Sequence, residues 1–437
     1  MLMVSAEPDE ASNPERDRLF HQPAQPVVAR PGVSLPTVYA GALALWLVTR
    51  GLVLVHQGAW PWMNAFVVAA ARAIVVGDWN EAVRPQLPAV LGVPLVLAGA
   101  DEQLSVAVLY VFASMVQFGA LLVLARALWP GRIVEQSLAL LIFLLVPYNH
   151  SIHHYRDVPV VLACSAIFLL AAHWLRKPAT LGARDVAWVG GAMLLGVWSR
   201  TEVLTFVGVM VLLGLLIWRR GALPSVAMYA SAAVVVVGAF LLVNRLEGVD
   251  PAEAARYQWH TFLDSTPESW LSAQCRAEPT ENCRERDGLT YFGPAQPEAG
   301  VVPMVLAHPL PTLAKTAQSG FDNLWIVFGP NLSTFPGVVP FVVVVLALAP
   351  VRAVLAMVPP THWVVALAVV AETVLPPLSW APPHPQYHLQ LVLAAIVVLV
   401  PVLLGLSQAK RGQTLAMAFL AAYAALSAFR YTRYAGY

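Results

Sequence analysis

Polar and apolar residues are strongly segregated along this chain. Residues 1–36 are polar and rich in proline, as in "EPDEASNPERDRLFHQPAQPVVARPG". After them, apolar runs recur that are long enough to cross the roughly 30 Å hydrocarbon core of a bilayer as helices. The first 36 residues contain no apolar stretch typical of a cleavable signal peptide. We therefore predict a disordered cytoplasmic tail over residues 1–36.

The apolar runs predict an all-α polytopic membrane protein with about eleven transmembrane helices. The predicted spans are 37–56, 104–127, 134–148, 157–175, 186–199, 202–218, 224–244, 337–357, 361–376, 388–406 and 414–430.

Basic residues indicate the orientation of these spans, because short cytoplasmic loops are enriched in Lys and Arg. Arg430 and Arg433 go against the alternation, so either that end is an exception or the number of helices differs by one. The basic residues that fall in alternate loops are Arg126, Arg132, Arg176, Lys177, Arg184, Arg219, Arg220, Arg352, Lys410 and Arg411.

With this orientation, polar segments gather on the outer face. They are 57–103, 148–157, 198–202 and the large loop 245–336, joined by 378–390. A site with chemical activity is therefore expected outside. The predicted division of the chain is a tail (1–36), an N-terminal transmembrane module with the outer loops (37–244), a large extracytoplasmic loop (245–336) and C-terminal transmembrane helices (337–437).

Composition supports a membrane protein and excludes several other classes. The chain is 58% hydrophobic and 12% charged, whereas soluble domains carry about 25% charged residues. The net charge of +1 argues against a nucleic-acid partner. The sequence also lacks a GxGxxG, P-loop, HExxH or GxSxG motif in a suitable context, so a soluble nucleotide-binding domain is not expected.

The stretch "PYNHSIHHYRDVPVV" (147–161) concentrates ionisable residues at the edge of two apolar runs. His150, His153, His154 and Asp157 would share one face of a helix. Three interpretations stay open: a set of metal ligands, acid–base groups acting on a substrate, or an interfacial turn at the lipid head groups. A divalent metal is the one cofactor that this set suggests.

Two of the three cysteines lie close together in the large loop, in "CRAEPTENC". A close pair facing an oxidising compartment predicts a disulfide between Cys275 and Cys283. The alternative is two free thiols. Cys164 lies inside an apolar run, where an inert packing role is expected.

Seven short motifs follow one another over most of residues 37–405. They are "LVTRGLVLV", "NAFVVAAARAIVVGDW", "RPQLPAVLGVPLVLAG", "HHYRDVPVVLACSAIFLLAAHWLRK", "GVWSRTEVLTFVGVMVLLGLL", "LAHPLPTLAKTAQSGFDNLW" and "PHPQYHLQLVLAAIVVLVP". By their order and spacing, these segments resemble the GT-C superfamily of membrane glycosyltransferases. They are most similar to the family 39 and aminoarabinose-transferase-like branch, which includes protein O-mannosyltransferases.

The resemblance implies a GT-C-like bundle that transfers a sugar from a polyprenyl-phosphate carrier to an extracytoplasmic lipid, glycan or protein. The implied location is a membrane of the cell envelope, the bacterial inner membrane, with the active face outward. A carboxylate would deprotonate or orient the acceptor hydroxyl, and arginines would hold the phosphate. The expected catalytic residues are Asp157, His154, Asp78 and Glu81, and the expected substrate-binding residues are Asn64, Arg84, His153, Arg156, Arg200, Glu202 and Tyr387.

The sequence departs from the family pattern at its main catalytic aspartate. "AWPWMNAF" occupies that position and offers Asn64, whose amide cannot accept a proton at neutral pH. Asp157 is the first substitute, although capping of the following helix would also explain it. The alternative function is therefore a catalytically degenerate relative, or a transporter, that binds a lipid-linked sugar without transferring it.

Two further features have both structural and functional explanations. Arg200 and Glu202 flank a tight turn and form either a local ion pair or a phosphate-binding element. Glu372 lies within an apolar run towards its outer end. A buried acid there indicates either a polar structural partner or a role in a site.

Overall fold

In the computed structural model, the described residues are 34–57, 62–77, 86–145, 158–176, 182–218, 223–246, 251–277, 281–293, 299–328, 351–374, 391–407, 414 and 417–425. Every regular element within these residues is a helix, and none of them is a strand. The predicted all-α class is confirmed. Most of the predicted tail and of the run 337–357 lie outside the described residues.

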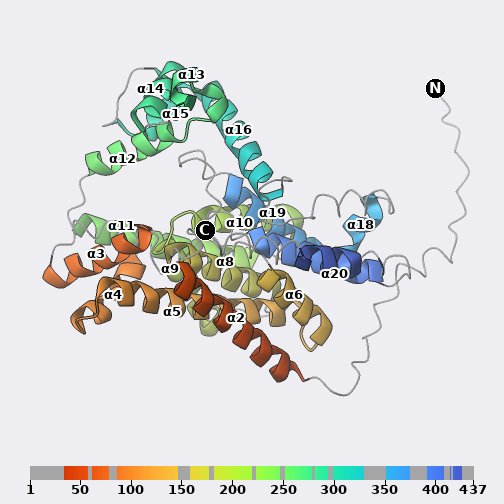
Figure 1. The fold of residues 1–437 in the computed structure, drawn as a ribbon. Coiled ribbons are helices and arrows are strands. Elements are labelled where there is room, and N and C mark those ends of the chain that lie inside the picture. The colour runs from red at the N-terminus through yellow and green to blue at the C-terminus, as the bar shows by residue number, and fades with distance from the viewer. Residues whose placement is uncertain are drawn as a thin grey trace, which may run out of the picture.

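The helices form a main bundle and a smaller unit (Figure 1). The main bundle contains α2 (Leu35–Gln57), α3 (Trp62–Val76), α4 (Gln86–Leu97), α5 (Glu102–Leu128), α6 (Ile133–Leu145), α8 (Val158–Arg176), α9 (Ala183–Val197), α10 (Val203–Trp218), α11 (Leu223–Leu246), α18 (Val351–Met357), α19 (Pro360–Val374) and α20 (Leu391–Ser407). The smaller unit contains α12 (Pro251–Asp264), η3 (Glu268–Trp270), α13 (Ala273–Ala277), α14 (Glu281–Phe292) and α15 (Val301–Ala307), and α16 (Pro309–Phe328) follows it.

Three of the described helices are long and apolar enough to cross a membrane, namely Glu102–Leu128, Val158–Arg176 and Pro224–Val243. Seven other helices contain shorter described apolar stretches, of 10–17 residues, where a span needs about 20 residues. These are Leu35–Val48, Phe66–Val76, Leu87–Leu97, Ile133–Leu144, Val203–Leu216, Pro360–Glu372 and Leu391–Leu406. An eleven-span bundle is therefore not confirmed.

Helix α8 is the centre of the main bundle. Its sequence is apolar on every side, a pattern typical of a helix enclosed by others. It packs against α5, α9, α10 and α19. Of the 18 residues in its most apolar stretch, 89% are buried. In α11 the corresponding share is only 17%. Helix α11 thus presents an apolar surface outward, including Val234 and Val235.

Close packing within the bundle depends on two glycines. A Cβ atom at Gly214 would lie 2.5 Å from Cη2 of Trp174, so the indole ring occupies the space of a side chain. At Gly196 a Cβ atom would lie 2.8 Å from a methyl group of Val203 and 3.0 Å from Cβ of Ala166. Gly196 therefore lets the end of α9 approach both α8 and the start of α10.

Polar contacts fasten the helices at the end of the bundle where α8 finishes and α9 begins. Nε2 of His173 lies 3.2 Å from Oδ1 of Asp185, and Nδ1 lies 3.1 Å from the hydroxyl oxygen of Tyr229. These contacts join α8, α9 and α11. At the same end Tyr39 hydrogen bonds with Gln136, which joins α2 to α6.

The smaller unit has a core of its own, formed by Trp259, Phe262, Leu263, Phe292 and Met304. Figure 1 shows α12–α15 set apart from the main bundle, with α16 running from them to α19. Helix α16 has the reverse of the pattern of a surface helix in a soluble protein, with polar residues buried and apolar residues exposed. Its buried face carries Thr312, Lys315 and Ser319, while Leu310, Leu313 and Phe321 are exposed.

Candidate functional site

The turn between α9 and α10 holds a buried ion pair. Nη2 of Arg200 lies 2.6 Å from Oε1 of Glu202, and Nε of Arg200 donates to the same oxygen at 3.2 Å. The side chains are only 10% and 11% exposed. The predicted local pair is therefore present, and it lies inside the protein rather than on its surface.

The backbone of this turn is held from two sides. Arg200 N donates to Gly196 O at 2.7 Å, which tightens the end of α9. Leu87 N, in the first turn of α4, donates to Trp198 O at 3.1 Å. The start of α4, which the sequence places directly after Arg84 and Pro85, is thus docked beside the turn.

Glu372 joins the pair from α19, which packs against α10. It is only 3% exposed, and it lies close enough to Glu202 and Arg200 for both charges to act on it. Its Oε2 atom is buried and has no hydrogen-bond partner among the described residues. We refer to Arg200, Glu202 and Glu372 together as the charged corner.

The electrostatics of the corner are set by one guanidinium shared between two carboxyl groups. Burial alone would raise the pKa of Glu202, but the charge and the hydrogen bonds of Arg200 outweigh it and hold that pKa below its ordinary value. Glu202 is therefore a carboxylate that neutralises Arg200. The carboxyl group of Glu372 has no further cation within this set.

The corner lies at the opposite end of the bundle from the basic loops. His362, near the start of α19, contacts the ring of Trp129 just after α5. Glu372 is ten residues further along the same helix, roughly 15 Å away at 1.5 Å per residue. Arg126 and Arg132 therefore flank the end of the bundle remote from the corner.

Most of the predicted site residues lie outside the described residues. This holds for Asp78, Glu81, Arg84, His150, His153, His154, Arg156, Asp157 and Tyr387. Asn64 lies on α3, but its side chain is not described. Their assigned roles remain predictions. Within the part of the chain that the structure describes, no group of three or more His, Cys, Asp or Glu side chains is placed to hold a metal.

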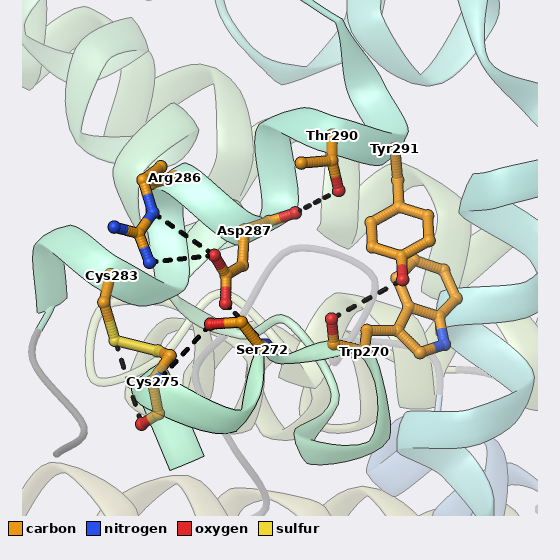
Figure 2. A network of polar contacts seen from close by, with 8 residues as sticks. All are labelled: Trp270, Ser272, Cys275, Cys283, Arg286, Asp287, Thr290 and Tyr291. Atoms are coloured by element: carbon orange, nitrogen blue, oxygen red, sulfur yellow. Dashed lines mark hydrogen bonds and ion pairs between the residues drawn. A yellow bond between two sulfur atoms is a disulfide. The ribbon is translucent and has the colours of Figure 1, made fainter. Parts of the chain in front are cut away.

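The predicted disulfide between Cys275 and Cys283 is present and joins α13 to α14. A polar network supports it (Figure 2). Ser272 N donates to Oδ2 of Asp287 at 2.7 Å, and Cys275 N donates to the Ser272 hydroxyl at 3.2 Å. The hydrogen bond from Ser272, helped by Arg286, holds the pKa of Asp287 below its ordinary value.

Sequence reasoning missed a second buried charge, Lys315 of α16, which packs against the smaller unit. Nζ of Lys315 donates to the Ser265 hydroxyl and lies 4.2 Å from the ring centre of Phe262. Burial lowers the pKa of Lys315 to about 7. One signal was available: Lys315 shares a helix face with Thr312 and Ser319, while the other faces of α16 carry leucines.

No known protein family, characterised protein or solved structure matches this chain. The resemblance to GT-C enzymes therefore has no support from these comparisons, and the function has to be argued from the charged corner and the apolar bundle around it.

Proposed function

We propose that this chain is an integral membrane glycosyltransferase with a GT-C-like bundle. It takes a sugar from a polyprenyl-phosphate donor and transfers it to an acceptor on the extracytoplasmic side. One observation carries the proposal: a buried set of charged residues, Arg200, Glu202 and Glu372, lies at one end of an otherwise apolar helical bundle. Ionisable groups in such surroundings are costly and mark functional sites by default.

The exposed apolar surface supports a membrane location for the bundle. Helix α11 exposes Val234, Val235, Leu241 and Leu242. Large exposed apolar patches mark contacts with a membrane or with another protein. Helix α16 adds Leu310, Leu313 and Phe321 outside a polar buried face, which is the arrangement expected of a helix that contacts lipid.

The position of basic residues supports an outward-facing corner. Arg126 and Arg132 flank the end of the bundle remote from Glu372. Arg176 ends α8 and Arg184 begins α9, whereas Arg200 follows the end of α9. Short cytoplasmic loops carry the excess of Lys and Arg, so the corner is assigned to the extracytoplasmic side.

The residues of the charged corner suit the two groups of the proposed reaction that carry or develop charge, the leaving phosphate and the acceptor hydroxyl. The carrier phosphate leaves as an anion, and a guanidinium binds phosphate oxygens through its planar fork. Arg200 supplies that guanidinium, and Glu202 holds it in place through Oε1. An acceptor hydroxyl must lose a proton, which a neighbouring carboxylate accepts. Apolar helices beside the turn suit an isoprenoid chain.

The test is a transfer assay with purified protein in detergent. Radiolabelled polyprenyl-phosphate mannose, glucose, galactose and arabinose are offered with a Ser/Thr peptide, an oligosaccharide and a lipid extract as acceptors. The wild type is compared with the double variant R200Q/E202Q, which removes both charges together. The control is R132Q/E135Q, which removes the ion pair of 3.4 Å at the remote end of the bundle.

We expect label transfer by the wild type and by R132Q/E135Q, and a loss of about 100-fold or more in R200Q/E202Q. Asp157→Asn is run in parallel, since its loss of transfer would support the predicted catalytic role of Asp157. No turnover with any donor would contradict the proposed glycosyltransferase activity. If the wild type then still bound polyprenyl phosphate, the degenerate binding relative suggested by Asn64 would be the better account.

A further inference from the structure

Glu372 is a buried acid without a hydrogen-bond partner for Oε2 among the described residues. Buried polar side-chain atoms are nearly always paired, and each exception calls for an explanation. An unpaired carboxyl oxygen inside a protein destabilises the fold, and more strongly when it is charged. A residue kept for packing alone would be Leu or Gln at lower cost, so the carboxyl group itself is the feature to explain.

The charges around Glu372 give it a different role from that of Glu202. Burial is the largest influence on the Glu372 carboxyl group, the negative charge of Glu202 acts in the same direction, and the positive charge of Arg200 opposes both. Glu202 already accepts two hydrogen bonds from Arg200 through Oε1. Cys164 of α8 is the other titratable neighbour on which Glu372 acts, and it carries no charge that would neutralise an acid. Glu372 is therefore the carboxyl group of the corner that remains available to a proton donor.

Glu372 lies near the end of α19, close to the turn that holds Arg200. It lies two residues before the end of α19 at Val374, and the predicted outer segment 378–390 follows. Helix α10 packs on α19, which brings the turn with Arg200 to the same corner. A phosphate bound by Arg200 and an acceptor hydroxyl bound by Glu372 would thus lie close to each other.

We propose that Glu372 is the catalytic base of the transfer, contacting the acceptor hydroxyl and replacing the family aspartate whose position Asn64 occupies. This inference rests on the proposed function. The acceptor oxygen forms the new bond to the anomeric carbon of the sugar, and its proton passes to Oε2 of Glu372. The bond between the anomeric carbon and the phosphate oxygen breaks, and its electron pair leaves on the polyprenyl phosphate beside Arg200.

The experiment measures steady-state transfer by the full chain carrying Glu372→Gln, with the donor that the wild type uses. Gln keeps the shape of the side chain and removes its proton acceptor. We expect kcat to fall about 100-fold or more, with KM for the donor unchanged within about threefold. Glu372→Asp should recover part of kcat, because the carboxylate is retained at a shorter reach.

A pH profile separates a base from a residue that only supports the structure. Wild-type kcat should fall at low pH as the base becomes protonated, and the residual activity of Glu372→Gln should lack that fall. The control is Glu135→Gln at the remote end of the bundle, which should leave both kcat and the profile unchanged. Unfolding temperatures of all variants in detergent show whether each one folds.

The outcomes distinguish this inference from the proposed function. Full activity of Glu372→Gln in an active enzyme would overturn the inference and leave the glycosyltransferase standing. The inference would also be overturned if Glu372→Gln lowered kcat but its residual activity still fell at low pH as in the wild type, since that pattern indicates a structural role. A wild type inactive with every donor would overturn the proposed function, and the inference would fall with it.

Discussion

Arg200 donates two hydrogen bonds to a single oxygen of Glu202, from Nη2 at 2.6 Å and from Nε at 3.2 Å. Both side chains are nearly buried, so each charge depends on the other. Removing one partner of a buried pair leaves an uncompensated charge, which costs roughly 3 kcal/mol or more. Replacing both by uncharged residues avoids that cost.

We therefore expect R200Q to lower the unfolding temperature strongly, E202Q to lower it less because Glu372 remains beside Arg200, and R200Q/E202Q to be more stable than R200Q. A double-mutant cycle in detergent measures the coupling between the two residues. Additive losses would show that the pair is not coupled, and the ion pair would then be a surface feature of little consequence.

Replacement of Gly214 by Ala should destabilise the packing of α10 on α8. The new Cβ atom would lie 2.5 Å from the ring of Trp174, and overpacking of this kind costs about 1–3 kcal/mol. Gly208 lies on the same helix, and a Cβ atom added there would meet no neighbouring side chain within 4 Å. Gly208→Ala should therefore be neutral or gain about 0.5–1 kcal/mol from helix propensity. Thermal unfolding of the two variants side by side tests the contrast.

The disulfide predicts a specific count of free thiols. The chain contains three cysteines, and two of them are joined as Cys275–Cys283. Denatured but unreduced protein should therefore react with one equivalent of maleimide, at Cys164, and reduced protein with three. Replacing both Cys275 and Cys283 by Ser should destabilise the smaller unit by about 2–3 kcal/mol. Three reactive thiols without reduction would contradict the bond.

Lys315 should make the stability of the smaller unit depend on pH. Its pKa is about 7 in the folded chain and about 10.4 when unfolded. Between these values the unfolded chain binds more protons, so the contribution of Lys315 to stability increases as pH rises from about 7 to about 10. Below about pH 7 both states are protonated and this contribution is constant.

Lys315→Met removes this titration while keeping a long apolar stem. The difference in unfolding free energy between the wild type and Lys315→Met should therefore shift in favour of the wild type as pH rises through that range. Limited proteolysis or hydrogen exchange of residues 251–328 at several pH values reports on the unit itself. A difference that stays constant with pH would show that the pKa of the Lys315 amine is not depressed.

The apolar periodicity predicted the all-α class because long apolar runs admit few other structures. The same periodicity could not fix the number of spans, because an apolar run indicates a buried helix but does not show whether lipid or protein surrounds it. Helix α8 is enclosed by protein, whereas α11 exposes much of its surface, although the two sequences are similarly apolar. Tertiary packing, which decides between them, is not encoded in the composition of either helix.

The site was predictable only in part. The Cys275–Cys283 pair and the Arg200–Glu202 pair are close in sequence, so their contacts follow from local spacing. Glu372 is 170 positions from Glu202 in the chain, and only the packing of α19 on α10 brings the two together. The contact of Lys315 with Ser265 is likewise long-range, and its only signal was the helix face that Lys315 shares with Thr312 and Ser319.

The most direct test of the proposed function is the binding of polyprenyl phosphate to the charged corner. The ligand is titrated into wild type, R200Q/E202Q and R132Q/E135Q in detergent at one ionic strength, because phosphate contacts are sensitive to salt. We expect R200Q/E202Q to weaken binding about tenfold or more, while R132Q/E135Q binds like the wild type. Equal affinity of all three proteins would contradict the proposal, because the carrier phosphate would then bind elsewhere.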